Sequence, residues 1–288
     1  MTATDSFVDH RNLLFTVAYE MLGSAADAED VLQETWLRWS EVDHEHVRDE
    51  RAYLVRITTR LSLNRMRSNA RRRESYVGPW LPEPLLTTPD VAEDVELADS
   101  VSTAMLVVLE TLSPMERAVF VLREIFDLAY DEIAAAVDKT PVAVRQIASR
   151  ARAHVSDRRP RGDVTPSQRD EVIARFLGAT ASGDLQGLMD VLAPDVVLLT
   201  DGGGVKKAAL RPILGREKVV RFLDAVAPEG VQADVVVVNG APALRLLVDG
   251  ELDGIGTMLV EDGLVPGLYI VRNPAKLSRL DEVVALTR

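Results

Sequence analysis

Arginines without acidic neighbours are the first feature of this chain that could do chemistry. Seven arginines lie between positions 56 and 73, with no Asp or Glu among them. Four of them, Arg56, Arg60, Arg67 and Arg71, fall within about one sixth of a turn of each other on an ideal α-helix. Like charges at i,i+4 spacing repel by a few tenths of a kcal/mol per pair, and a polyanion would relieve that repulsion. We therefore expect this face to bind nucleic acid, with a solvated arginine face as the alternative.

A second basic segment has the pattern of a helix-turn-helix. A helix at residues 130–137 and one from Pro141 to about residue 159 are separated by a short polar break, with Thr140 as the cap of the second helix. On that helix, Arg145, Ser149 and Arg152 share the face opposite the apolar stripe, flanked by Gln146. Such side chains bind base edges in the major groove. Helical cores that do not bind DNA have the same pattern, so the motif alone leaves both interpretations open.

The charge of the chain is strongly segregated. An even distribution of the formal net charge of −12, with a pI near 4.9, would argue against nucleic acid. The acidic residues instead concentrate at residues 27–34, at 90–99 and in the C-terminal half. In the helix expected at residues 25–39, the polar face opposite the apolar stripe carries Asp27, Glu29, Asp30, Gln33 and Glu34. This face suits either a protein partner or solvent at a helix N-terminus that favours acidic side chains.

Composition narrows the chemistry further. The chain of 288 residues has no cysteine, which excludes disulfides, Cys-ligated zinc, iron–sulfur clusters and thiol nucleophiles. Its N-terminus has no basic-then-apolar signal, and no run of about 18 apolar residues occurs. We expect a soluble, cytoplasmic protein without a metal ion or a cofactor.

The segment from Arg71 to Leu85, RRRESYVGPWLPEPL, ends the arginine-rich helix. Its three prolines each remove a backbone donor and disfavour the helical region for the preceding residue. The segment therefore predicts an extended linker. The linker is more apolar than a passive spacer requires, so we expect it to dock on another surface through Tyr76, Trp80, Leu81 and Leu85.

Periodicity and local signals predict helices first and a mixed domain second. The signals include Ser24 as a helix cap, a capping box of Ser113 and Glu116, and a turn at Asn239-Gly240. Helices are expected at residues 7–22, 25–39, 51–73, 100–112, 114–126, 130–137 and 141–159, with a mobile acidic stretch at 89–99. After a polar linker at 160–166, the expected elements are helices at 169–181, 185–192 and 215–225, a strand at 196–200, and antiparallel strands at 231–238, 243–248, 251–260 and 264–271. This order predicts an α+β cone with one concave face.

Several of these motifs together resemble an extracytoplasmic-function (ECF) sigma factor of bacterial RNA polymerase. The resemblance is carried by DAEDVLQETWLRW at residues 27–39, SYVGPWLPEPL at 75–85, SPMERAVFVLREIFDLAYDEIA at 113–134 and TPVAVRQIASRAR at 140–152. DGGG at 201–204 and NPAKL at 273–277 resemble a SnoaL-like (NTF2-like) domain, so the whole chain is similar to the sigma subgroup with that extension. The resemblance implies a multidomain fold of two all-α domains followed by an α+β cone. Sigma region 2 would occupy residues 1–75, a linker 76–99, the region-4 helix-turn-helix 100–160, and the regulatory cone 167–288.

Some positions depart from the subgroup pattern. Tyr53 stands where tryptophan is commoner, and Asn64 where aspartate is usual. The lysine that follows the glycine run comes one residue late, as Lys206, and Ala275 replaces an acid. The two C-terminal changes bear more on the regulatory contacts of the cone than on promoter binding.

The resemblance implies roles for matching residues. The clamp coiled coil of core RNA polymerase would be bound by Asp27, Glu29, Asp30, Gln33 and Glu34, and the polymerase flap is the second expected contact. The −10 element of promoter DNA would be held by Arg56, Arg60, Asn64, Arg67 and Arg71. The −35 element would be read by Thr140, Arg145, Gln146, Ser149, Arg150 and Arg152. The cone would act in cis through Trp80, Leu81, Pro82, Glu83, Pro84, Asp201, Gly202, Gly203, Gly204, Asn273, Pro274, Lys276 and Leu277.

Two other classes of protein compete with this interpretation. SnoaL-like cones can be enzymes, but all four histidines precede the cone, which leaves aspartates beside turns, such as Asp195, Asp201 and Asp253, as its acid/base candidates. We expect no catalytic residue. A dimeric repressor would use only the helix-turn-helix, which would leave the arginine face and the acidic helix without a role. The sequence leaves open the promoter, the inducing signal, the sign of regulation, the oligomeric state, a small-molecule ligand of the cone and any separate anti-sigma factor.

Overall fold

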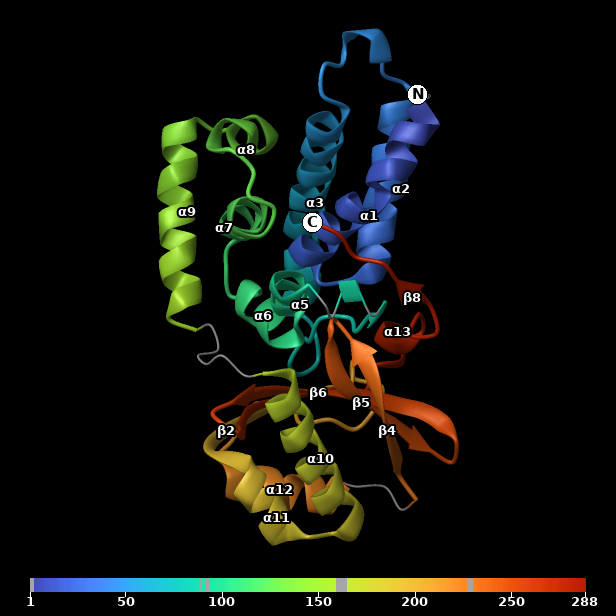
Figure 1. The fold of residues 1–288 in the computed structure, drawn as a ribbon, viewed down its shortest axis with the longest axis vertical. Helices are drawn as coiled ribbons and strands as arrows, with labels where there is room; N and C mark the ends of the chain where they lie inside the picture. Colours follow the sequence, from blue (N-terminus) through green and yellow to red (C-terminus); the bar gives the residue numbers. More distant parts are fainter. Residues whose placement is uncertain (1–2, 89, 92–93, 159–164, 227–229) are drawn as a thin grey trace. The chain divides into compact units, whose positions relative to one another are not determined.

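A computed structural model describes residues 3–88, 90–91, 94–158, 165–226 and 230–288 (Figure 1). The chain divides into two compact units. Unit 1 comprises Met1–Ser75, Thr87–Arg159 and Val284–Arg288, and unit 2 comprises Tyr76–Leu86 and Pro160–Val283. The apolar linker therefore folds with the C-terminal domain, whereas the last five residues of the sequence fold with the helical unit.

Unit 1 begins with three helices that pack on one another. They are α1 (Ala3–Leu22), α2 (Ala25–Ser40) and α3 (Glu50–Glu74), with the 3-10 turn η1 (His44–His46) before α3. Ser24 caps α2 by accepting from the amide of Asp27 at 3.2 Å, as predicted, and Asp49 caps α3. Tyr19, Trp39 and Leu54 are buried. Their burial fixes which face of α3 remains outside.

The second half of unit 1 is also helical. Its elements are α5 (Val95–Val101), α6 (Thr103–Leu109), α7 (Pro114–Phe120), the π-helix η2 (Val121–Ile125), α8 (Tyr130–Val137) and α9 (Pro141–Ser156). Ser113 and Glu116 form the predicted capping box at α7, and Thr140 caps α9. Asp138 adopts φ 56° at the break between α8 and α9. A short polar residue tolerates this left-handed conformation, so the chain turns there.

The prediction of one helix over residues 100–112 was wrong. Asp94 accepts from the amide of Leu97 at 3.1 Å and starts α5 earlier, within the stretch expected to be mobile. Ser102 then interrupts the helix and caps α6 by accepting from the amide of Met105 at 3.1 Å. A short side chain that satisfies free backbone amides restarts a helix wherever the chain bends. The expected linker at 160–166 lies outside the described residues up to position 164.

Unit 2 combines helices with a sheet. The helices α10 (Pro166–Ser182), α11 (Leu185–Val191) and α12 (Arg216–Val226) gather on one side of the sheet (Figure 1). Phe176 of α10, Val219 of α12 and Leu198 and Leu268 of the sheet are buried in one core. The apolar stripes of the helices thus cover one face of the sheet. None of the helices among the described residues is long and apolar enough to cross a membrane.

The sheet contains the predicted antiparallel strands and one parallel pair. Its strands are β1 (Leu86–Thr87), β2 (Leu192–Asp201), β3 (Ile213–Leu214), β4 (Gln232–Val238), β5 (Ala241–Val248), β6 (Glu251–Glu261), β7 (Leu264–Val271) and β8 (Val283–Val284). β4 to β7 form the expected meander, and β2 lies parallel to β7, with Asp201 opposite Val271. The predicted Asn239-Gly240 turn is confirmed, with φ 53° and 71°. A short helix, α13 (Pro274–Leu277), follows β7.

Candidate functional site

The described arginines on the outer face of α3 are accessible and lack acidic partners. Arg60 and Arg67 are exposed, and Arg56 is half-buried with its guanidinium 4.8 Å from the centre of the Tyr53 ring. Arg67 donates to the Asn64 side-chain oxygen at 3.4 Å. Within the described part of the chain, none of these three arginines pairs with a carboxylate. The side chain of Arg71 lies outside the described residues. The charge of Arg56, Arg60 and Arg67 is therefore not neutralised by a carboxylate among the described residues.

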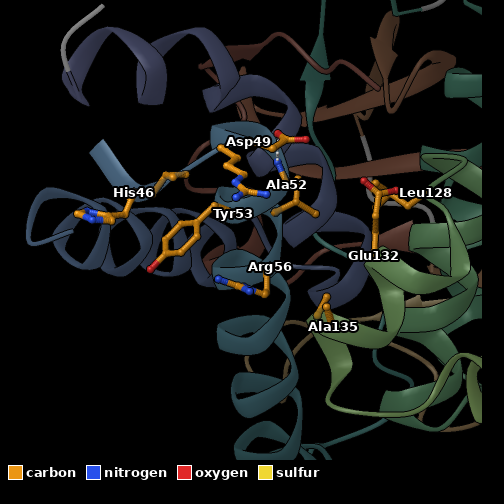
Figure 2. Close-up of a pocket in the computed structure, with 12 residues that line it drawn as sticks. His46, Asp49, Ala52, Tyr53, Arg56, Leu128, Glu132 and Ala135 are labelled. Atoms are coloured by element: carbon orange, nitrogen blue, oxygen red, sulfur yellow. Dashed lines mark hydrogen bonds between the residues drawn. The ribbon is translucent and has the colours of Figure 1, made fainter. Parts of the chain in front are cut away.

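Helix α8 packs beside this face and engages one of its arginines. Arg60 donates from Nε to the Ala136 carbonyl at 3.2 Å and from Nη2 to the Ala135 carbonyl at 2.9 Å. These carbonyls end α8, where the helix dipole favours a cation. Beside the contact lies a cavity of about 420 Å³, and Figure 2 shows Arg56 of α3 opposite Glu132 and Ala135 of α8. Arg60, which was expected to bind DNA, thus forms hydrogen bonds with α8 instead.

Helix α9 presents the predicted recognition residues on one side. Its apolar stripe, including Val144 and Ile147, is buried, while the polar candidates on the helix, Arg145, Gln146, Ser149, Arg150 and Arg152, are exposed. Arg152 donates from Nε to Glu124 at 3.0 Å and from Nη2 to the Tyr130 hydroxyl at 2.9 Å. The Arg145 guanidinium lies 5.3 Å from the centre of the Tyr130 ring. Tyr130 of α8 therefore orients two arginines of α9.

The acidic face of α2 is only partly free. Asp30, Gln33 and Glu34 are exposed, but Asp27 is tied down, because Asn69 donates to its Oδ2 at 2.8 Å and Arg65 lies 3.3 Å from its Oδ1. Glu29 pairs with Arg11 at 2.8 Å, Asp30 with Arg65 at 3.2 Å and Glu34 with Arg38 at 2.7 Å. The exposed pairs are weak and exchange readily. Asp27 instead fixes the end of α3 against α2.

A buried polar cluster lies in the interior of unit 1 and was not predicted from the sequence. Glu20 of α1 accepts from the Ser100 hydroxyl at 2.8 Å, and its backbone carbonyl accepts from Arg117 Nε at 2.8 Å. Glu110 forms ion pairs with both Arg117 and Arg73. Burial raises the pKa of Glu20 to about 8 and lowers the pKa of Arg117 to about 9. The sequence signal is one glutamate between Tyr19 and Met21 on an otherwise apolar stripe.

The linker is bound by the C-terminal domain through the buried carboxylate of Asp201. The Tyr76 hydroxyl donates to Oδ1 at 2.6 Å, the Leu81 amide donates to Oδ2 at 2.9 Å, and Lys276 Nζ donates to Oδ2 at 2.7 Å. Leu81 is 0% exposed and Leu85 is 3% exposed. Burial and the neighbouring Asp201 carboxylate raise the pKa of Tyr76, so this phenol remains a hydrogen-bond donor. The structure thus brings the expected linker and glycine-run residues together.

Trp80 is held by the same lysine. Lys276 Nζ lies 3.9 Å from the centre of the Trp80 ring and 5.0 Å from that of Tyr76. It also donates to the Leu81 carbonyl at 2.5 Å. Asn273 donates to the Tyr76 hydroxyl at 2.7 Å. One ammonium group therefore binds two aromatic faces and the linker backbone, a geometry that favours a cation stripped of water.

The glycine run and a hairpin turn complete the linker site. A Cβ at Gly203, which has φ 61°, would lie 2.4 Å from the Asn273 amide nitrogen, so a larger residue would displace Asn273. The side-chain oxygen Oδ1 of Asn239 accepts from the backbone amide of Leu85 at 3.0 Å, and the backbone amide of Asn239 donates to the Leu85 carbonyl at 2.9 Å. Tyr76 was expected only as an apolar residue of the docking linker, and Asn239 only as a turn residue, so the hydrogen bonds of both were not predicted. In the sequence, Tyr76 is a single aromatic residue and Asn239 an ordinary turn residue.

Acid/base chemistry in the C-terminal domain has little support from the described residues. Burial alone would raise the pKa of Asp253, but hydrogen bonds from Arg272 and Lys206 hold it below its ordinary value. Lys206 pairs with it at 3.0 Å and Arg272 at 2.8 Å. A carboxylate held ionised in this way is a poor general base. Among the described residues, no group of three or more His, Asp or Glu side chains could hold a metal ion.

Comparisons with known proteins agree with one another over most of the chain. Residues 7–72 match the sigma-70 region 2 family, and residues 102–155 match the sigma-70 region 4 family. The ECF RNA polymerase sigma factor SigJ of Mycobacterium tuberculosis (strain ATCC 25618 / H37Rv) is 38% identical over 290 residues, covering 93% of this chain and 91% of the relative. A probable ECF RNA polymerase sigma factor, SigI, of the same strain is 33% identical over 282 residues, covering 94% and 93%. The crystal structure of M. tuberculosis SigJ matches with a TM-score of 0.79 and 34% identity, covering 96% of this chain and 98% of that one.

Proposed function

Because this chain belongs to the extracytoplasmic-function RNA polymerase sigma factors, we propose that it binds core RNA polymerase, directs promoter recognition and initiation, and is modulated in cis by its C-terminal domain. Because core RNA polymerase and promoter DNA are cytoplasmic, the protein would act in the cytoplasm. The mechanism is binding and strand separation, without covalent chemistry. Region 2 corresponds to residues 1–75, the linker to 76–99, region 4 to 100–160 and the regulatory domain to 167–288.

Region 2 supplies the −10 contacts in this proposal. Arg56 and Arg67 of α3 have no carboxylate partner among the described residues, which suits a single-stranded phosphate backbone. Arg56 and the exposed Asn64 lie on the same face of α3 as Tyr53. The ring of Tyr53 can stack on an unpaired base. Arg60 reaches DNA once α8 has left its guanidinium.

Region 4 supplies the −35 contacts. Arg145, Gln146 and Ser149 project from the exposed side of α9, where they can bind base edges in the major groove. Thr140, at the helix N-terminus, can bind a phosphate together with the first free amides. Arg152 must exchange Glu124 for DNA, so its contact with the promoter costs an ion pair.

The acidic side chains of α2 are the proposed core-binding surface. Asp30 and Glu34 form only exposed pairs, which a basic partner helix can replace at little cost. Asp27 and Glu29 extend this surface toward the start of α2. Free sigma factor with a net charge of −12 is repelled by DNA. Binding of core polymerase over the acidic helix relieves that repulsion.

The regulatory part of the proposal is carried by one observation. Residues 81–85 of the linker are buried in unit 2, held by Asp201, Lys276 and Asn239. An extended residue spans about 3.3–3.6 Å, so docking of Tyr76–Leu86 removes up to about 40 Å of free reach between regions 2 and 4. The spacing between the −10 and −35 elements requires a defined reach. Linker docking is therefore the step through which the C-terminal domain sets activity.

A gel shift tests the sigma-factor function. A pool of genomic DNA fragments is incubated with the protein alone, with core polymerase alone, and with both. We expect specific fragments to be retained only by the combination. Equal retention by the protein alone would indicate a repressor, and no retention by any mixture would contradict promoter recognition.

Two charge-reversal variants sharpen this test. Asp30→Lys with Glu34→Lys should abolish retention, whereas Asp170→Lys with Glu171→Lys, two exposed acids of α10, should not. Both variants change the net charge by the same amount. A loss with both would show that the effect is one of overall charge rather than of the α2 face.

A further inference from the structure

Residues 284–288 leave the C-terminal domain and fold with the helical unit. The Val284 carbonyl accepts from the Thr88 amide at 3.3 Å, and the Thr287 amide donates to Thr16 Oγ1 at 3.1 Å. Leu286 is 1% exposed, and Thr16 in α1 is 0% exposed. These contacts involve backbone groups, the buried Thr16 hydroxyl and the buried Leu286 side chain, so the segment is docked rather than resting on the surface.

Arg288 binds the acidic start of α5. It pairs with Asp94 at 3.1 Å and with Glu96. Asp94 is also the N-cap of α5, since its Oδ1 accepts from the Leu97 amide at 3.1 Å. A guanidinium is the complement of the acidic stretch at residues 90–99. Because exposed ion pairs contribute little affinity, Leu286 provides the anchor and Arg288 sets the register.

Helix α5 continues from this contact into the buried polar cluster. Ser100 at its other end donates to the Glu20 side chain at 2.8 Å. Glu20 of α1 in turn binds Arg117 of α7 through its backbone carbonyl. A connected run of contacts thus leads from Arg288 through α5 and α1 to region 4.

Arg288 also lines a polar cavity shared with the recognition helix. This cavity of about 570 Å³ is bordered by Glu96 of α5, Glu124 of η2, Tyr130 of α8 and Arg152 of α9. Arg123 and Asp127 also line it, so three arginines and three carboxylates meet at this cavity. The segment at residues 284–288 is therefore a neighbour of the −35 surface as well as of α5.

We propose that residues 284–288 are an intramolecular clasp that holds α5 on α1 and keeps regions 2 and 4 packed together. The inference rests on the proposed sigma function, because only a protein that must engage two promoter elements needs the α3–α8 contact at Arg60 to open. The clasp continues directly from Val283 of the C-terminal domain, so a displacement of that domain pulls on α5. Two segments are thus exchanged between the units. The linker at residues 76–86 folds with unit 2, and the clasp at residues 284–288 folds with unit 1.

Hydrogen exchange on the full-length protein, without polymerase or DNA, tests the clasp. Leu286→Asp and Arg288→Glu should raise exchange of the α5 amides at residues 95–101 by about tenfold or more while leaving β6 in the C-terminal domain unchanged. Arg279→Glu, which breaks a pair with Glu282 inside unit 2, is the matched control and should leave α5 unchanged. Combining Arg288→Glu with Glu96→Arg restores the pair in reverse and should restore slow exchange. Unchanged α5 exchange in both clasp variants, or equal acceleration across α5 and β6, would overturn the proposal.

Core binding completes the test and separates it from the sigma function. Leu286→Asp should bind core polymerase several-fold more tightly than the parent, because opening no longer costs the clasp. Faster α5 exchange without tighter core binding would show that the clasp only stabilises α5. It would overturn the proposal that the clasp opposes the separation of regions 2 and 4. If the parent protein itself does not bind core polymerase, the sigma function fails, and the exchange data still decide whether residues 284–288 hold α5.

Discussion

The side chain of Lys276 is bound to Asp201 in the interior of unit 2. Its Nζ lies 2.7 Å from Asp201 Oδ2, with the lysine side chain 11% exposed and the aspartate 0% exposed. The same two side chains bind both backbone groups of Leu81, the amide through Asp201 and the carbonyl through Lys276. A buried ion pair that is satisfied only when one residue of the linker is in place specifies a single docked register.

Removing one partner of this pair should destabilise the C-terminal domain strongly. Asp201→Asn or Lys276→Met leaves a buried charge or amine without its partner, which typically costs about 3–5 kcal/mol. The exposed pair of Asp234 with Arg245 is the control, and Asp234→Asn should cost less than about 1 kcal/mol. Denaturant unfolding followed by circular dichroism measures both. Similar losses for Asp201→Asn and Asp234→Asn would contradict the buried latch.

Stability of unit 1 should fall as the pH rises from about 5 to about 8. Burial raises the pKa of Glu20 from 4.5 to about 8, so in this window the folded state binds a proton that the unfolded state has lost. Stability then decreases with pH, because the unfolded state binds fewer protons. The total effect is on the order of a few kcal/mol. Glu20→Gln keeps the shape without the charge and should flatten this pH dependence, measured by denaturant unfolding at pH 5.5, 7 and 8.5. An unchanged slope in the variant would assign the dependence to other groups.

Much of the fold follows from local sequence signals. The starts of α2 and α7, the position of α9 and the hairpin turn at Asn239 were all predicted, because caps, prolines and Asn-Gly turns act within a few residues. The ECF sigma family and the order of helical domains and α+β domain were also predicted and are confirmed. The break at Ser102 was not predicted, because the apolar stripe continues past it and favours one helix, whereas a serine is compatible with both a helix interior and a helix cap.

The long-range features could not be read from the chain. Glu20 and Arg117 are ordinary charged residues in the sequence, and only the packing of α1 on α7 makes them a buried pair. Tyr76 and Asp201 are separated by 125 positions, so their hydrogen bond depends on the folded domain. No local sequence pattern predicts that residues 284–288 fold with the helical unit, because one leucine and one arginine are common in any short C-terminal segment. The roles of the DNA-binding and core-binding residues remain predictions.

Charge reversal on α2 should remove core binding without unfolding the protein. Asp30→Lys and Glu34→Lys change exposed side chains whose own pairs are weak, so the stability change should stay under about 0.5 kcal/mol each. Pull-down with core polymerase measures the binding, and thermal unfolding verifies the fold. Normal binding by a folded double variant would leave the acidic face as a solvated surface.

The arginines proposed to bind the −35 element should affect promoter choice more than general affinity. Arg145→Ala and Arg152→Ala each remove a side chain that can make a bidentate base contact, worth about 1–3 kcal/mol. Arg175→Ala, on the exposed side of α10, is the control. Transcription with the holoenzyme from a selected promoter and from one with an altered −35 element gives the ratio. A ratio that matches the control variant would remove α9 from promoter recognition.

Trp80 and Lys276 should act as one unit in regulation. The ammonium lies 3.9 Å from the centre of the Trp80 ring, and a desolvated cation–π contact of this kind is worth up to about 2 kcal/mol. Trp80→Ala and Lys276→Met should therefore each free the linker and change promoter output several-fold in the same direction. Because either change already releases the same contact, the double variant should resemble the stronger single one rather than their sum.

In vitro transcription with the four proteins of this double-mutant cycle, at saturating core polymerase, measures the coupling between Trp80 and Lys276. Trp80→Phe retains an aromatic face and should keep most of the parent output. Trp80 emission should also shift to longer wavelength in Lys276→Met, because the ring loses its covering cation and becomes more hydrated. Additive effects on output, together with unshifted emission, would show that linker docking at Lys276 does not set the activity of this sigma factor.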